Sequence, residues 1–101
     1  MNFDKFQTEA IEIEFSGNTA YANIRGLISP AYFVQQVRVI PNEYCSEVLI
    51  YVDKDRTPGK KFKSVLQGYK KQIKLGMFNA GQFCVRVNRK NDVVTWFKVK
   101  T

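Results

Sequence analysis

The stretch Thr57–Gly76 (TPGKKFKSVLQGYKKQIKLG) decides the predicted fold, because it has the clearest periodic pattern in the sequence. Thr57 and Pro58 suit the start of a helix, and Gly76 is a typical helix end. Apolar side chains recur at i, i+3, i+4, i+7 and i+11, on one helical face: Phe62, Val65, Leu66, Tyr69 and Ile73. The stretch therefore predicts a long amphipathic helix from about Pro58 to Leu75.

The same region carries the whole charge imbalance of the chain. Residues 54–76 contain eight Lys and Arg and one acid, Asp55, which gives +7, and the full chain of 101 residues is also +7. No acid lies four residues from any of these helical lysines, so none is paired along the helix. The candidate phosphate-binding lysines lie along one flank of the helix and its solvent border: Lys60, Lys63, Lys70, Lys71 and Lys74. The alternative is an ordinary solvated helix face.

Most of the remaining sequence alternates with the period of two that is typical of strands. Ile11–Phe15 and Thr19–Leu27 flank the turn signal Ser16-Gly17-Asn18 and predict a hairpin. Tyr32–Ile40 fits either a strand or a short helix, and its Val and Ile content favours a strand. Three further strands are expected: Glu47–Asp53, Gln82–Asn88 and Val93–Lys100.

The predicted order is ββββαββ in a single domain, residues 1–101. This is an α+β fold in which the helix covers one face of an antiparallel β-meander. In outline it resembles the Whirly-type single-strand-binding folds, which place four strands before a helix, although here a further hairpin follows. The expected core is Ile11, Ile13, Phe15, Val48, Ile50, Val52, Phe62, Leu66, Tyr69, Ile73, Val85 and Phe97.

A second candidate surface lies on the C-terminal hairpin. Alternation places Arg86, Trp96 and Lys98 on the face opposite the core, with Tyr21 and Arg25 of the first hairpin as candidate neighbours. Aromatic and basic side chains on a sheet are typical of platforms that stack single-stranded bases. The alternative is that Trp96 is buried beneath the helix as part of the core.

Several kinds of chemistry lack the residues they need. The chain has no histidine, which excludes Ser-His-Asp and Cys-His nucleophiles and the usual catalytic zinc sites. A phosphate loop at Gly59-Lys60 would need glycine and Ser/Thr where Lys54 and Lys61 stand. The acids Glu12, Glu14, Asp53 and Asp55 form no convergent cluster. We therefore expect no enzyme activity, no metal and no cofactor.

Cys45 and Cys84 both lie among apolar residues, so we expect buried free thiols, with a disulfide as the alternative. The sequence shows neither a signal-peptide pattern nor an apolar run of membrane-spanning length. The expectation is a soluble, cytoplasmic protein.

The charge pattern predicts a non-enzymatic nucleic-acid-binding protein, for DNA or RNA, with low sequence specificity. The alternative is a protein-interaction module or inhibitor that docks an acidic partner or occupies a nucleic-acid channel. Size and basicity also suit a phage- or plasmid-encoded accessory protein. A homodimer through a free strand edge is compatible with the sequence. No membrane role is expected, because the apolar helical stripe is needed to cover the sheet.

Overall fold

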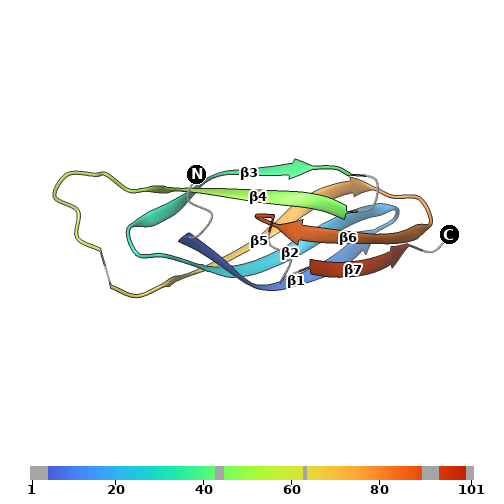
Figure 1. Cartoon of the computed structure of the whole chain (residues 1–101), viewed down its shortest axis with the longest axis horizontal. Coiled ribbons are helices and arrows are strands. Elements are labelled where there is room, and N and C mark those ends of the chain that lie inside the picture. The colour runs from blue at the N-terminus through green and yellow to red at the C-terminus, as the bar shows by residue number, and fades with distance from the viewer. Residues whose placement is uncertain (1–4, 43–44, 63, 90–93, 100–101) are drawn as a thin grey trace.

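The computed structural model describes residues 5–42, 45–62, 64–89 and 94–99. In these residues two β-sheets pack face to face in an elongated molecule of 54 × 24 × 18 Å (Figure 1). One sheet has the strand order β1-β2-β5, and the other has the order β3-β4-β6-β7. The strands are β1 (Phe6–Ser16), β2 (Thr19–Ile28), β3 (Tyr32–Ile40), β4 (Cys45–Lys54), β5 (Gln67–Met77), β6 (Gly81–Val87) and β7 (Val94–Val99).

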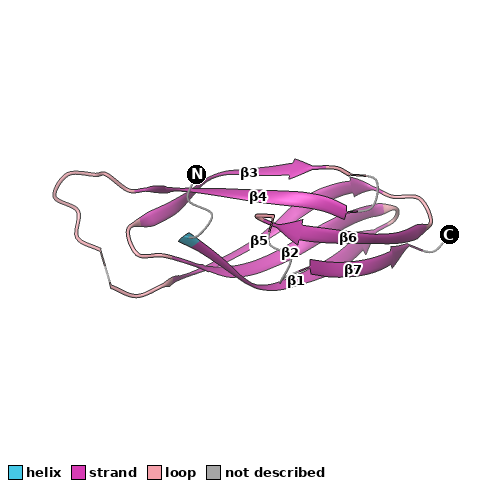
Figure 2. Cartoon of the chain, in the orientation of Figure 1, coloured by secondary structure: helices cyan, strands magenta, loops and turns pink. Residues whose placement is uncertain are grey.

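The predicted α+β fold class and the helix from Pro58 to Leu75 are wrong, since the described residues contain no α-helix (Figure 2). The described residues between β4 and β5, 55–62 and 64–66, lie in a loop that leads from one sheet to the other. The Pro58-Gly59 pair forms a turn: Lys60 N donates to Thr57 O at 3.4 Å. Gly59 has φ of 74°, the positive value that a type II turn needs at its third residue. Without a helix, the outline resemblance to Whirly-type folds disappears.

β5 is a strand because β2 offers it a complete antiparallel partner. The pairing runs from Thr19↔Met77 to Ile28↔Gln67, with one irregularity after Ala20. The hydrogen bonds and burial gained from this pairing outweigh the helix propensity of a lysine-rich segment. The predicted strands elsewhere are confirmed in the described residues. β3 has the predicted ends, whereas β1 begins at Phe6 and not at Ile11.

The second sheet departs from a meander because β4 and β6 run parallel. They pair from Cys45↔Cys84 to Val48↔Val87. Cys45 and Cys84 form a disulfide at the first of these pairs, so the expectation of free thiols is wrong. At the other end, Asn88 continues the ladder, since its backbone N donates to Val48 O at 2.9 Å and its Oδ1 accepts from Ile50 N at 2.7 Å.

The core lies between the inner faces of the two sheets. Of the predicted core residues, these are buried: Ile11, Val48, Ile50, Val52, Ile73, Val85 and Phe97. Ile13 and Tyr69 are partly buried against this cluster. Phe15, Phe62 and Leu66 were predicted wrongly, with 40%, 37% and 50% of their surface exposed. Phe62 and Leu66 lie in the loop, where no helix brings them onto the sheet.

Gly26 of β2 makes room for a buried aromatic ring. Phe6 is 1% exposed and packs edge-to-face on Tyr69, with 5.5 Å between ring centroids. A Cβ on Gly26 would stand 2.6 Å from both Phe6 Cζ and Gln7 O. One side of this contact is backbone, so a rotation of the Phe6 ring alone cannot relieve it.

Gly26→Ala should therefore lower the free energy of unfolding by about 1–3 kcal/mol through overpacking. Urea denaturation followed by circular dichroism measures the change. Gly68→Ala is the matched control, because a Cβ there meets nothing within 4 Å. The control should stay within about 0.5 kcal/mol of the unaltered protein. An equal decrease in the free energy of unfolding of both variants would contradict the close packing at Gly26.

The Cys45–Cys84 disulfide should stabilise the fold strongly, because the cysteines are 39 residues apart in sequence. The chain-entropy relation for a loop of this length gives about 4 kcal/mol. The free energy of unfolding of Cys45→Ser/Cys84→Ser, measured by urea denaturation, should be lower by up to this amount. A reducing agent should lower the melting temperature of the unaltered protein and leave that of the double variant unchanged. Insensitivity of the unaltered protein to reduction would refute this role.

Candidate binding surfaces

Lys70 and Lys74 project from the outer face of the β1-β2-β5 sheet. Ala22 and Ile24 of β2 point into the core, so the residues between and beside them point outward. The strand register then places Lys70 beside Arg25 and Lys74 beside Tyr21. The outer face therefore carries two cross-strand pairs of β2 and β5: Tyr21 with Lys74, and Arg25 with Lys70 four positions further along.

The outer face of this sheet is divided by charge. Glu12 and Glu14 lie on β1, at the side away from β5. Glu14 Oε2 accepts hydrogen bonds from Asn23 Nδ2 of β2 at 3.4 Å and from Gln72 Nε2 of β5 at 2.7 Å. The amides thus engage the carboxylate at the centre of the face, and the positive charge is concentrated toward β5.

In the part of the chain that the structure describes, β5 pairs with β2 alone and is therefore an edge strand of its sheet. Lys71 lies opposite Ile24 and therefore on the inner side of this strand, yet it is exposed at the edge. Among the described residues, Lys70, Lys71 and Lys74 form no ion pair. Basic residues on both sides of an edge strand are a known protection against unwanted strand pairing, which is the simplest structural explanation for them.

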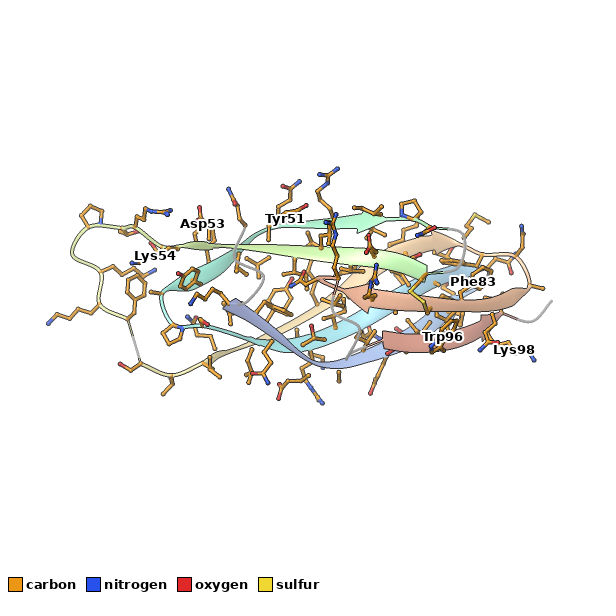
Figure 3. All side chains as sticks on the ribbon, viewed as in Figure 1. Tyr51, Asp53, Lys54, Phe83, Trp96 and Lys98 are labelled. Atoms are coloured by element: carbon orange, nitrogen blue, oxygen red, sulfur yellow. A yellow bond between two sulfur atoms is a disulfide. The ribbon has the colours of Figure 1, made fainter. Side chains whose placement is uncertain are left out.

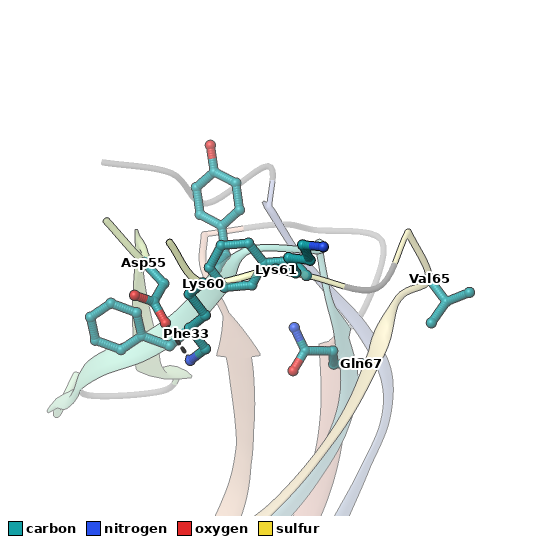
Figure 4. Close-up of a pocket in the computed structure, with 8 residues that line it drawn as sticks. Phe33, Asp55, Lys60, Lys61, Val65 and Gln67 are labelled. Atoms are coloured by element: carbon teal, nitrogen blue, oxygen red, sulfur yellow. Dashed lines mark hydrogen bonds and ion pairs between the residues drawn. The ribbon is translucent and has the colours of Figure 1, made fainter. Parts of the chain in front are cut away.

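Lys60 and Lys61 lie in the loop between β4 and β5, where Asp55 fixes the local geometry. The Asp55 carboxylate accepts from Lys60 Nζ at 2.7 Å and from Thr57 Oγ1 and N at 2.6 and 3.0 Å (Figure 4). The hydrogen bond from Lys60, followed by those from Thr57, lowers the pKa of Asp55 from 3.8 to about 2. Lys60 Nζ also lies 5.4 Å from the centre of the Phe62 ring. Lys61 forms no ion pair with any described residue.

The loop arches over a cleft of about 510 Å³ (Figure 4). The side chains that line it come from the loop, from β3 and from the first residue of β5: Tyr32, Phe33, Asp55, Lys60, Lys61, Phe62, Val65 and Gln67. Tyr32, Phe33 and Gln67 were not singled out from the sequence. Tyr32 and Phe33 belong to β3, which is distant in sequence from the loop, so no local pattern could have identified them.

Arg86, Trp96 and Lys98 alternate with buried residues and therefore lie on the outer face of the other sheet, where Trp96 is the register partner of Cys84. Figure 3 shows Trp96 and Lys98 on β7. Trp96 is 60% exposed, so the alternative that it is a core residue is wrong. Arg86 is ion-paired with Glu47, its register neighbour on β4. The arrangement agrees with the alternation predicted for this hairpin.

The structure does not bring the predicted site residues into one surface. Lys70 and Lys74 face outward from one sheet and Trp96 and Lys98 from the other, so the two groups lie on opposite sides of the sandwich. Lys63 lies outside the described residues. The predicted surface that combined the lysines with Arg86 and Trp96 is therefore not continuous.

Within the described ranges, no group of three or more His, Cys, Asp or Glu side chains could hold a metal ion. The same part of the chain contains no helix that is long and apolar enough to cross a membrane. No protein-family model matches the sequence, and no curated protein or solved structure is significantly similar to it. Functional proposals must therefore start from the surfaces themselves.

The hydrogen bonds to Asp55 predict a specific titration. Its pKa is lower in the folded chain than the ordinary 3.8, so the ionised carboxylate stabilises the loop above pH 3.8 and this stabilisation is lost as the pH falls toward 2. NMR of the Asp55 carboxyl carbon should show a midpoint near 2. Lys60→Met should raise the midpoint toward 3.8, and Lys61→Met should leave it unchanged. The same midpoint in all three proteins would show that Lys60 does not hold this carboxylate.

Proposed function

We propose that this protein is a non-enzymatic interaction module that binds an acidic protein segment along β5. The observation that carries the proposal is a long strand edge, together with lysines that form no ion pair with the described residues. β5 spans 11 residues and, among the described strands, pairs with β2 alone. Lys70, Lys71 and Lys74 on this strand form no ion pair with the described residues.

An edge strand presents a row of backbone N–H and C=O groups that an extended peptide can pair with. Such a peptide would lie beside β5 as a further strand of the sheet. Its alternate side chains would face outward, near Lys70 and Lys74, so acidic residues at these positions would be favoured. The lysines would then give charge selectivity, and the backbone would supply most of the directional hydrogen bonds.

The disulfide supports a protein partner. Disulfides persist in oxidising compartments and are rare in the reducing cytosol. The Cys45–Cys84 bond therefore favours an oxidising compartment in place of the cytoplasm expected from the sequence. In such a compartment the partner is better sought among acidic proteins than among cellular nucleic acids.

Nucleic-acid binding is the second candidate, and one observation favours it. Tyr21 lies beside Lys74, and Arg25 lies beside Lys70, on the outer face of one sheet. In such an arrangement the cations can contact phosphates and the aromatic ring can stack on a base. This candidate would use DNA or RNA with low sequence specificity, and its affinity would fall steeply with salt.

The two candidates are separated by binding assays at about 50 mM salt, where electrostatic binding is strong. The probes are a fluorescent Glu-Val repeat peptide, a Lys-Val repeat peptide, and single- and double-stranded DNA and RNA oligonucleotides. We expect the Glu-Val peptide to bind and to shift the backbone amide signals of β5, and the Lys-Val peptide not to bind. Lys70→Glu/Lys71→Glu/Lys74→Glu should weaken binding at least tenfold.

The matched control is Arg38→Glu/Arg89→Glu/Lys98→Glu, which changes the net charge equally, from +7 to +1 (7 − 6). All three control residues are exposed and lie outside β5. The control should retain most of the binding, and circular dichroism should show both variants folded. Binding of oligonucleotides alone, lost in the β5 variant, would reject the acidic-peptide proposal and establish the second candidate.

A further inference from the structure

Exposed apolar side chains gather at one end of the molecule, in the loop of residues 55–66 and the adjoining start of β3. Phe62, Val65 and Leu66 are 37%, 60% and 50% exposed, and Phe33 of β3 is 45% exposed. Phe33, Phe62 and Val65 line the same cleft, and Leu66 follows Val65 in the loop. Figure 4 shows Phe33 and Val65 on opposite sides of this cleft. We call this group, with Lys60 and Lys61, the tip.

The tip is also positively charged. The described residues from Asp53 to Leu66 include four basic side chains (Lys54, Arg56, Lys60 and Lys61) and two acids, which gives 4 − 2 = +2. The two acids, Asp53 and Asp55, engage Arg56 and Lys60. Lys61 remains without an ion pair among the described residues. Lys60 and Lys61 line the cleft together with Phe62 and Val65, so positive charge lies beside the apolar side chains.

The shape of the tip allows a flat surface to reach it. The loop lies at one end of the 54 Å long axis and extends past the strands (Figure 1). A Cβ on Gly59 would meet nothing within 4 Å, so the turn at Pro58-Gly59 is open to solvent. The hydrogen bonds of Asp55 with Thr57 and Lys60 hold this turn in shape.

We propose that the tip docks on an anionic lipid bilayer. Phe62, Val65 and Leu66 enter the interface between headgroups and acyl chains, and Lys60 and Lys61 lie at the phosphates. Apolar side chains next to lysines at a protruding position are the composition of interfacial anchors, whose binding depends on apolar burial and on attraction to anionic lipid. The sequence argument against a membrane role required these apolar residues to lie on a helix and cover the sheet, and the structure leaves them exposed in a loop. The β5 lysines discussed above are not part of this surface.

Sedimentation with lipid vesicles tests the proposal. The full chain should bind vesicles of phosphatidylcholine with about 30% phosphatidylglycerol, and binding to pure phosphatidylcholine should be much weaker, because the tip is basic. Phe62→Ser/Val65→Ser/Leu66→Ser should lower binding at least tenfold. Lys61→Glu should lower it at least about fivefold, the effect expected for one basic residue at such a surface.

Matched controls lie at exposed positions away from the tip. Met77→Ser/Trp96→Ser removes two side chains that are 76% and 60% exposed, and Lys98→Glu reverses one exposed charge. Both controls should bind as the unaltered protein does. A Phe62→Trp substitution in a Trp96→Phe background should give a blue-shifted emission on anionic vesicles, whereas the native Trp96 emission should not shift. Failure of the unaltered protein to bind anionic vesicles, equal binding to neutral ones, or equal losses in tip and control variants would overturn the proposal.

Discussion

The short parallel pairing of β4 with β6 is the constraint on which the second sheet depends. Only four residue pairs form it, from Cys45↔Cys84 to Val48↔Val87, and without them the sheet would separate into the hairpins β3-β4 and β6-β7. The disulfide secures one end of this ladder, and the side chain and backbone of Asn88 extend the other. Parallel strands cannot be joined by a tight turn. The chain therefore crosses to the opposite sheet as β5 before it returns as β6, and residues 55–66 are the loop that this crossing requires.

The strands could be predicted where alternation was clear, as in β2, with Ala20, Ala22 and Ile24 inward, and in the C-terminal hairpin. The helix prediction failed because a spacing of four residues fits both the helical period of 3.6 and the strand period of two. Val65, Tyr69 and Ile73 share a face in a helix, and they would also share a face in a strand. The lysines and glutamines around them favour a helix locally. The segment is a strand because it pairs with β2, which lies about 50 positions away in sequence and outside any local window.

The candidate surfaces were predictable only in part. The outward direction of Arg86, Trp96 and Lys98 followed from alternation, but their separation from the β5 lysines depends on which sheet each strand joins. The sequence does contain a signal for the disulfide. Cys45-Ser46-Glu47-Val48 and Cys84-Val85-Arg86-Val87 place cysteine, opposite charges and valine at equal offsets, as a parallel register would. The sequence contains no comparable signal for the cleft under the loop, because Tyr32 and Phe33 reach the cleft only through the tertiary fold.

The disulfide also has a topological consequence for the most accessible part of the chain. Cys45 and Cys84, 39 positions apart, close a covalent ring that contains the loop and all of β5. A protease that cuts after Lys60 or Lys61 would open this ring without releasing either fragment. The piece with β1–β4 and the piece with β5–β7 would stay joined through sulfur, and β2 and β5 would still be paired across the cut. A backbone cut in this exposed loop would thus leave the molecule in one piece.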